Sequence, residues 1–168
     1  NRINFKKNII DVKKIRNKNN LNKLNKNLML IYTGIQRNAP EVAKKYVNTL
    51  TIQNKKSINK LIEHVNVGEK IVKNGNIDDF GDLLDEAWHY KKEISSNISN
   101  FKIDKIYEEA KKSGALGGKL LGAGGGGFML FYFKDNKKKN FLKKNRKLIN
   151  TLFNFSQEGS EIIFNHTK

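Results

Sequence analysis

Glycine is concentrated in one short segment of this chain, and that segment limits the possible folds more than any other feature. Eight of the 13 glycines lie between Gly114 and Gly127, and the segment ends in the loop Gly122-Ala123-Gly124-Gly125-Gly126-Gly127. The loop contains the spacing G-x-G-x-x-G, but a dinucleotide-binding loop is followed by a helix, and no Lys-Ser/Thr pair closes it as in a Walker A loop. Here the apolar run Phe128 to Phe133 follows, which predicts a buried strand. The glycines therefore indicate a tight connection that leads into a strand.

The loop holds more glycine than a turn requires. A two-residue hairpin turn needs one or two glycines, whereas four consecutive glycines follow Ala123 here. Glycine allows positive φ and a close approach of other groups to the backbone, and successive free N–H groups in such a turn can bind an anion. Two interpretations follow: a hairpin turn alone, or a loop that contacts a phosphate or substrate. The excess of glycine favours the second.

The remaining pattern predicts an α+β domain. Residues 1–13 are expected to be extended, residues 17–27 to form a polar connection or a short helix, and the apolar run 28–32 to form a buried strand. Helical spacing predicts helices over about 40–53, 57–74, 77–95 with Asn76 as N-cap, 103–113 and 136–149; strands are expected at 119–121, 128–133, 151–155 and 161–164. Without the extra helices this order is β-α-β-β-α-β, the ferredoxin-like split motif. We expect the helices to pack on one face of a mostly antiparallel sheet.

Composition excludes several classes of protein. The chain has no cysteine, so it has neither a disulfide framework nor a zinc-thiolate site. Its longest apolar run, Phe128 to Phe133, is far shorter than a membrane helix, and a cytoplasmic location is the expectation. The net charge of +17 invites a nucleic-acid interpretation, but 29 of the 33 basic residues are lysine and only four are arginine. Because the chain also holds 24 asparagines, AT-rich codon usage explains much of this charge, and nucleic acid is not the expected partner.

Two motifs resemble a known family of kinases. The segment from Ser113 to Phe128, read as SGALGGKLLGAGGGGF, resembles the third motif of the GHMP kinases, and the segment 31–39, read as IYTGIQRNA, resembles a Thr-Gly…Arg stretch of the same family. The pattern from Trp88 to Ser99 and the turn Glu158-Gly159-Ser160 resemble the branch of D-glycero-D-manno-heptose 7-phosphate kinases. The resemblance runs from about Ile3 to Ile163.

The resemblance implies a C-terminal lobe without its partner lobe. Family members carry the ATP loop and the catalytic Asp in an N-terminal lobe, and neither motif occurs in this chain, which also lacks an initiating Met. We therefore expect residues 1–26 to be a strand and connection from a missing N-terminal lobe, and residues 27–168 to be the GHMP kinase C-terminal domain. ATP and Mg²⁺ would be bound mainly by the missing lobe, no catalytic residue would lie in this chain, and the chain alone would be inactive.

Six positions in the loop and five outside it are the expected site residues. Carried over from the family motif, Gly122, Ala123, Gly124, Gly125, Gly126 and Gly127 would line the active site. Thr33, Arg37 and Lys119, with Ser96 and Ser99, would contact a sugar or its phosphate, because Arg suits a phosphate group and hydroxyls suit a sugar. Each has a simpler interpretation: a surface salt bridge for Arg37, an exposed strand lysine for Lys119, and helix capping near Asn100 for the serines.

Three functions are therefore compared. The first is the substrate-binding lobe of a kinase that phosphorylates the anomeric hydroxyl of heptose 7-phosphate, for nucleotide-heptose and surface polysaccharide synthesis. The second keeps the family but changes the substrate to a galactose-like sugar or a mevalonate-type acid. The third is a stand-alone ferredoxin-like module that binds anions or nucleic acid. No metal site is expected, because His64 and His89 are single residues without ligand spacing to a partner.

Overall fold

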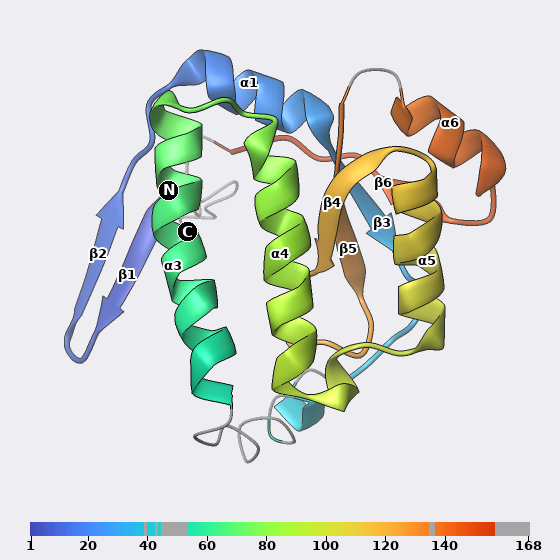
Figure 1. The fold of residues 1–168 in the computed structure, drawn as a ribbon, viewed down its shortest axis with the longest axis horizontal. Helices are drawn as coiled ribbons and strands as arrows, with labels where there is room; N and C mark the ends of the chain where they lie inside the picture. The colour runs from blue at the N-terminus through green and yellow to red at the C-terminus, as the bar shows by residue number, and fades with distance from the viewer. Residues whose placement is uncertain (39, 43, 45–53, 135–136, 157–168) are drawn as a thin grey trace, which may run out of the picture.

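The computed structural model describes residues 1–38, 40–42, 44, 54–134 and 137–156 (Figure 1). A four-stranded sheet lies at the centre of the described chain, and helices cover both of its faces. In chain order the elements are β1 (Arg2–Lys6), β2 (Ile9–Lys13), α1 (Lys18–Asn27), β3 (Leu28–Tyr32), α3 (Lys55–Asn74), α4 (Asp79–Ile94), the 3₁₀ turn η2 (Ser96–Ile98), α5 (Phe101–Lys112), β4 (Ala115–Leu120), β5 (Phe128–Phe133), α6 (Lys137–Lys144) and β6 (Ile149–Thr151).

The sheet confirms the ferredoxin-like topology. Its strand order is β4-β5-β3-β6, and every neighbouring pair is antiparallel. The two β-α-β halves interleave, since β5 lies between β3 and β4, the strands that the helices α3 to α5 connect. This is the arrangement expected of the split motif. In the register of β3 with β5, Met29 is opposite Phe131 and Ile31 is opposite Met129, so these apolar side chains share one face.

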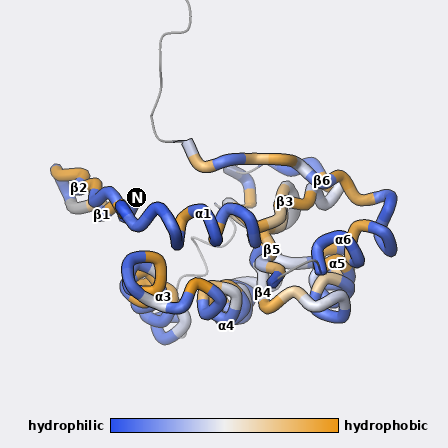
Figure 2. The backbone as a smooth tube through the Cα atoms, turned by 90° about the horizontal axis from the view of Figure 1, so that it is seen from above, coloured by the Kyte–Doolittle hydropathy of each residue, from blue (hydrophilic) through white to orange (hydrophobic). Residues whose placement is uncertain are grey.

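Alternation along β5 explains why the sheet is covered on both faces. Met129, Phe131 and Phe133 are fully buried against α5, α6 and Trp88 of α4. Tyr132 is fully buried in a second cluster that α1, α3 and α4 complete. Figure 2 shows α5 and α6 on one side of the strands and α1 and α3 on the other. The expectation of helices on one face is therefore wrong, because β5 presents large apolar side chains to both faces and each needs a cover.

Two glycines allow α4 to lie directly on the edge strand β4. A Cβ atom on Gly117 would lie 2.1 Å from the carbonyl oxygen of Gly81, and a Cβ atom on Gly81 would lie 2.5 Å from Cβ of Leu116. Glycine inside a strand often marks such a close approach. The strand consequently begins at Ala115, earlier than the expected 119–121, and Gly117 and Gly118 belong to it.

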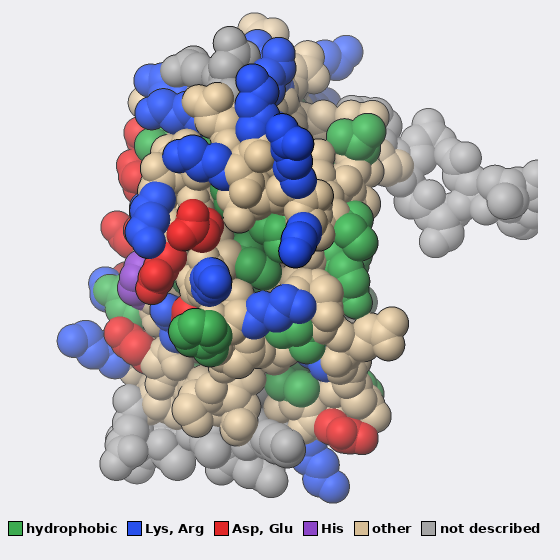
Figure 3. Space-filling view, turned by 90° about the vertical axis from the view of Figure 1, so that its right-hand side faces the viewer, with side chains coloured by type: hydrophobic (Ala, Val, Ile, Leu, Met, Phe, Trp, Pro, Cys, Tyr) green, Lys and Arg blue, Asp and Glu red, His purple; other side chains and the backbone are tan. Residues whose placement is uncertain are grey.

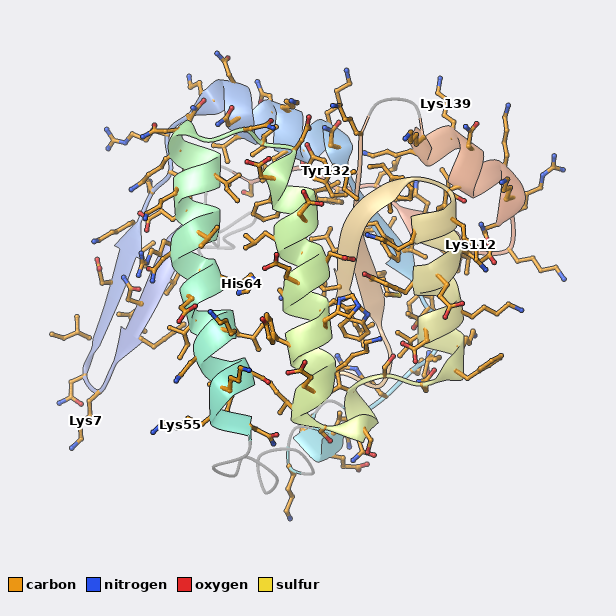
Figure 4. All side chains as sticks on the ribbon, viewed as in Figure 1. Lys7, Lys55, His64, Lys112, Tyr132 and Lys139 are labelled. Atoms are coloured by element: carbon orange, nitrogen blue, oxygen red, sulfur yellow. The ribbon has the colours of Figure 1, made fainter. Side chains whose placement is uncertain are left out.

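A buried polar network joins α1, α4 and β5 behind the second cluster. The hydroxyl of Tyr132 donates to Oδ1 of Asp78 at 2.6 Å and accepts from Nδ2 of Asn27 at 2.8 Å (Tyr132 is labelled in Figure 4). Lys23 and Lys134 approach the same carboxylate at 3.3 and 3.4 Å. The Tyr132 hydroxyl and then these two ammonium groups hold the pKa of Asp78 below its usual value.

The strands β1 and β2 form a separate two-stranded sheet that projects from the body beside α3 (Figures 1 and 2). Arg2 on β1 donates to Glu69 on α3 at 2.5 Å, and this ion pair ties the hairpin to the helix. The extended conformation expected for residues 1–13 is confirmed, and residues 17–27 form the helix α1. In the described part of the chain no helix is both long and apolar enough to cross a membrane.

Several expected boundaries are wrong. The N-cap of α4 is Asp78 instead of Asn76, whose side-chain oxygen accepts from the Asp78 N–H at 3.2 Å in the preceding turn. The basic helix α6 ends at Lys144, before the expected residue 149, and the last described strand occupies 149–151 instead of 151–155. The apolar side chains at 152–156 support no strand pairing here, and Leu152 is 89% exposed. The expected strand 161–164 and most of the helix 40–53 lie outside the described residues.

Candidate functional site

The glycine-rich loop connects β4 to β5 in a conformation that depends on glycine. Leu121 N–H donates to the Phe128 carbonyl at 2.8 Å and closes the loop at its base. Gly122, Gly124, Gly125 and Gly127 have φ values of 69°, 112°, 74° and 92°. These values lie in the left-handed region that other residues rarely adopt. The concentration of glycine in the sequence is therefore explained by backbone conformation at four of the six loop positions.

Unlike a simple turn, the loop packs against two other segments of the chain. Gly125 N–H donates to the Ile98 carbonyl of η2 at 2.9 Å, and Gly127 N–H donates to the Ile35 carbonyl at 3.0 Å. A Cβ atom on Gly124 would lie 2.9 Å from Cα of Ile98, and one on Gly126 would lie 2.8 Å from the Ile35 carbonyl oxygen. The backbone of the loop is thus in direct contact with its neighbours, so side chains are excluded on two sides.

Basic side chains hold the carbonyl groups of this loop. Arg37 donates from Nε to the Gly126 carbonyl at 3.0 Å. Lys91 on α4 donates from Nζ to the carbonyls of Leu120 at 2.9 Å and Gly122 at 2.6 Å. Within the described part of the chain, the N–H groups of Gly122, Ala123, Gly124 and Gly126 have no hydrogen-bond partner.

Thr33 fixes the strand end that faces the loop. Its side chain is 1% exposed, and its N–H and its hydroxyl both donate to the Gly127 carbonyl at 2.8 Å. The Ile35 N–H in turn donates to the Thr33 hydroxyl oxygen at 3.3 Å. Thr33 therefore holds loop and strand together, and its hydroxyl is occupied by protein groups.

Positive charge accumulates beside the loop. Burial, together with the nearby charges of Lys119 and Arg37, lowers the pKa of Lys91 to about 8. Burial also lowers the pKa of Lys119, which lies on β4. Among the described residues no carboxylate forms an ion pair with Arg37, Lys91 or Lys119. Three cations without an acidic partner make this end of the sheet suited to an anion.

An open cleft of about 450 Å³ adjoins the loop. Its lining consists of Tyr32, Ile35, Gln36, Arg37 and Gly127. The rings of Tyr32 and Phe128 lie 5.2 Å apart beside it. A volume of this order is typical of sites for small molecules. Arg37 belongs to both the cleft and the loop contacts, so a ligand in the cleft would meet a guanidinium group that is already oriented.

The two serines occupy different positions relative to the loop. Ser96 lies exposed on η2, the turn that contacts Gly125. The hydroxyl of Ser99 donates to Asp104 in the first turn of α5 at 2.8 Å, and Asn100 is the N-cap of that helix. Asn100 also donates from Nδ2 to the Gly125 carbonyl at 3.2 Å. Among the described residues of this segment, the side chain that forms a hydrogen bond with the loop is thus that of Asn100.

Lys91 is the functional residue that the sequence did not indicate. Leu84, Trp88 and Lys91 follow one another at helical spacing, so Lys91 falls on the stripe of α4 that faces the sheet. A lysine on an otherwise apolar stripe is the signal that identifies it. Lys119, by contrast, is expected at the loop from its place before the glycines, and the structure puts it on β4 within the electrostatic influence of Lys91.

The described residues do not supply a magnesium site. No group of three or more His, Asp or Glu side chains comes together in the part of the chain that is described. His64 lies between α3 and α4, where its Nε2 pairs with Glu86 at 2.9 Å (Figure 4). Mg²⁺ prefers carboxylate and phosphate oxygens, whereas the described side chains beside the loop are cations, which are suited to an anion.

Comparison with known proteins finds a family model that matches part of the chain. Residues 69–150 match the family model of the GHMP kinases C terminal. The chain is 33% identical over 107 residues to the bifunctional fucokinase/GDP-fucose pyrophosphorylase of Arabidopsis thaliana, a match that covers 62% of this chain and 10% of that protein. In fold it is similar to a Campylobacter jejuni protein described as a sugar kinase (28% identity, 90% of this chain, 42% of that chain, TM-score 0.62).

A mevalonate kinase structure is similar to the same extent. It is 26% identical, with coverage of 88% of this chain and 46% of that chain, and a TM-score of 0.63. The chain therefore spans less than half the length of the proteins it matches.

Proposed function

We propose that this chain, whose residues 69–150 match the family model of the GHMP kinases C terminal, is the substrate-binding lobe of an ATP-dependent small-molecule kinase. The observation that carries the proposal is the loop Gly122–Gly127, which has four N–H groups without a partner among the described residues and has Arg37, Lys91 and Lys119 beside it. Phosphoryl transfer depends mainly on positioning and on stabilisation of negative charge. Backbone N–H groups and cations fixed before the substrate arrives are suited to both tasks.

The substrate proposed for this lobe is a phosphorylated sugar, specifically heptose 7-phosphate. The cleft beside the loop has room for a sugar, and Arg37 on its wall can form paired hydrogen bonds to a phosphate group. The γ-phosphate of ATP would pass to the anomeric hydroxyl, giving a sugar 1,7-bisphosphate and ADP. In that step the residues of this chain bind the sugar phosphate and orient it, while the loop N–H groups and Lys119 stabilise the charge on the transferred group.

The same lobe could serve another substrate of the family. One similar protein is named as a fucokinase and another as a mevalonate kinase. A neutral sugar would leave Arg37 without an ionic partner, whereas the carboxylate of mevalonate would provide one. Three cations at the site have no acidic partner among the residues that the structure describes, which favours an anionic substrate over a neutral sugar.

The proposal includes a partner, an N-terminal kinase lobe that would bring ATP and Mg²⁺. The exposed apolar side chains of the β1–β2 hairpin support it: Phe5 is 78% exposed and Ile10, its cross-strand neighbour, is 65% exposed. A two-stranded hairpin is only marginally stable by itself, and a large apolar surface that is left exposed is typical of an interface. The match covers 46% and 42% of the two similar structures, so more than half of each lies outside the matched region and could supply such a lobe.

Calorimetric titration with substrates tests this function. We expect the chain to bind heptose 7-phosphate more tightly than unphosphorylated heptose. Arg37→Ala should weaken binding of the phosphorylated sugar alone, by about tenfold, because it removes one charge-assisted contact. Lys7→Ala, which removes an exposed charge on the distant hairpin, is the matched control. Equal affinity for both sugars, or preference for mevalonate, would reject the heptose phosphate assignment.

A turnover assay tests the division of labour between lobes. The 168-residue chain alone should release no ADP from ATP and heptose 7-phosphate, and addition of an N-terminal GHMP lobe should restore release. ADP release by the chain alone would contradict the proposal that the reacting groups lie on another lobe.

A further inference from the structure

A second cleft, of about 530 Å³, lies on the face formed by α5 and by α6 with the turn that follows it. Figure 3 shows this face, where Lys and Arg side chains surround a strip of apolar surface. The lining shares no residue with the cleft beside the glycine loop. Neither the family motifs nor the proposed kinase reaction assigns it a role.

The cleft is strongly and asymmetrically charged. Six of its ten lining residues are basic, namely Lys102, Lys105, Lys143, Lys144, Arg146 and Lys147. Its single acid, Glu109, also approaches Lys112 outside the cleft at 3.7 Å. Within the described chain none of the six forms an ion pair, whereas Lys60, Lys73 and Lys111 on other surfaces each pair with a carboxylate. The positive charge of this cleft is therefore not neutralised by carboxylates of the described chain.

The floor of the cleft is apolar and has a defined shape. Ile106 is 6% exposed, and Leu148 packs against the same core cluster. The turn that carries the cations is fixed by Asn145, whose Nδ2 donates to the Phe141 carbonyl at 3.0 Å, and by the Leu148 N–H, which donates to the Asn145 carbonyl at 3.0 Å. The basic side chains thus stand on a formed backbone on two sides of a common floor.

We propose that this cleft binds a small metabolite that carries two or more phosphate groups. The lysines would meet the phosphates from both sides, and the carbon skeleton would lie on Ile106 and Leu148. A bound phosphate carries nearly two negative charges at neutral pH, so two such groups match an unneutralised cluster of this size.

The observations favour a small ligand over a polymer. No aromatic side chain lines the cleft, so it offers no platform for the stacking of nucleic-acid bases. Only one of its cations is an arginine, the residue best suited to paired contacts with bases or phosphates. Its floor provides two apolar contacts, fewer than the repeated anchors that an amphipathic helix uses in a groove.

The cleft is connected to the glycine loop through α5. Lys102 lines the cleft, and its Nζ lies 2.9 Å from where a Cβ atom on Gly34 would be, next to the strand end that holds the loop. Asn100, the N-cap of the same helix, binds the Gly125 carbonyl. A ligand in the cleft would therefore contact the helix whose first turn positions the candidate active-site loop.

Binding of fructose 1,6-bisphosphate to the 168-residue chain, measured by calorimetry, tests the proposal. The double variant Lys105→Glu/Lys144→Glu should weaken binding by at least about tenfold, since it reverses charge on both walls. The control Lys7→Glu/Lys55→Glu makes the same change in net charge at exposed positions away from the cleft, both labelled in Figure 4, and should change binding less than about twofold. Thermal unfolding of both variants checks that they remain folded.

Three outcomes would overturn the proposal. Equal weakening in the two double variants would mean that net charge alone attracts the ligand. Loss of binding in Arg37→Ala would place the ligand at the glycine loop. Tighter binding of a polyglutamate peptide or of a 12-nucleotide single strand than of the bisphosphate would assign the face to a polymer. Retained binding in Arg37→Ala together with loss in Lys105→Glu/Lys144→Glu supports the proposed site and is independent of the kinase function.

Discussion

The glycine loop and the β1–β2 hairpin both connect or extend strands, yet they are stabilised in opposite ways. The loop has almost no side chains of its own, and its shape is set by hydrogen bonds from Thr33, Arg37, Lys91 and Asn100. The hairpin is rich in large apolar side chains, and most of them are exposed to solvent. The ion pair between Arg2 and Glu69 links it to the body.

The difference shows which of the two regions is held in place by contacts within this chain. The loop needs nothing further to hold its conformation, because the segments that fix it are present. The hairpin places Ile3, Phe5, Ile10 and Val12 on one face by cross-strand pairing, and all four are exposed. Since such a face is stable only when covered, the hairpin is where the proposed second lobe would join.

Substitution inside the loop should have the largest effect on the free energy of unfolding. Gly124→Ala forces an alanine to a φ of 112° and brings its Cβ atom to 2.9 Å from the Ile98 backbone. Backbone strain and overpacking each cost about 1–3 kcal/mol, so we expect the free energy of unfolding to fall by about 2–4 kcal/mol. Urea unfolding monitored by circular dichroism measures this change, provided the dependence on urea concentration is unaltered.

Gly125→Ala is the matched control for Gly124→Ala. Its φ of 74° is also left-handed, but the nearest atom to the new Cβ would be Cγ2 of Val42 at the ordinary distance of 3.5 Å. This variant should lose only about 1 kcal/mol, the cost of the backbone conformation. If both variants lose the same amount, close packing against η2 does not constrain the loop.

The same contrast explains what could be predicted from the sequence. Strands β3 and β5 are continuous apolar runs, and these runs with the helical spacing between them are sufficient to predict the ferredoxin-like order. The excess of glycine also predicts positive φ values and a close approach to the loop backbone, and both are present. Three features could not be predicted in this way: the close approach of Gly117 to α4, the turn of Lys91 toward the loop, and the end of α6 at Lys144. The first two depend on contacts between segments that are distant in sequence. At the third, Asn145 caps the helix locally and residues 149–151 then pair with β3.

Loss of the Lys91 ammonium should have an intermediate effect on the loop. Lys91→Met keeps most of the apolar stem but removes the donor to the Leu120 and Gly122 carbonyls, so we expect a loss of about 1 kcal/mol at pH 7. The pH dependence identifies the cause. In the folded chain burial lowers the pKa of Lys91 to about 8, whereas an unfolded lysine titrates near 10.4.

Between these two values the unfolded state binds the additional proton, so the contribution of Lys91 to stability rises as the pH increases from about 8 to about 10. The difference in unfolding free energy between the unsubstituted chain and Lys91→Met should therefore grow over that range. Lys55→Met, which removes an exposed ammonium from α3, controls for the loss of one charge. A difference that stays constant with pH would show that Lys91 is not buried against the loop.

Release of the hairpin should be a smaller and local effect. Glu69→Gln removes the charge that binds both Arg2 and Lys73, so hydrogen exchange at residues 1–13 should accelerate while exchange in β5 stays slow. Hydrogen-exchange mass spectrometry measures both. Glu63→Gln on the same helix, which breaks only the exposed pair with Lys60, is the control and should leave exchange in the hairpin unchanged.

Acid should act on the hairpin in the same way as Glu69→Gln. Lys73 and then Arg2 lower the pKa of Glu69 to about 2, below its value of about 4.3 in an unfolded chain. A carboxylate with a lowered pKa stabilises the fold fully above the unfolded value and loses its contribution as the pH falls through the folded value. Relative to the intrinsic exchange rate at each pH, the hairpin should therefore stay protected at pH 5 and lose its protection near pH 2. Loss of protection already at pH 5 would show that the ion pair does not anchor it.

The smallest effect on stability is expected on the apolar face of the hairpin, and it separates the two regions most clearly. Phe5→Ser changes a side chain that is 78% exposed, so the unfolding free energy of the chain alone should change by less than about 0.5 kcal/mol. When an N-terminal GHMP lobe is added, the same variant should weaken association measured by gel filtration, because the lobe would cover this face. Lys7→Ser, an exposed polar position in the same hairpin, should not. If Phe5→Ser associates as well as the unsubstituted chain, the proposed second lobe joins elsewhere. The exposed face of the hairpin would then not be the surface that this lobe covers.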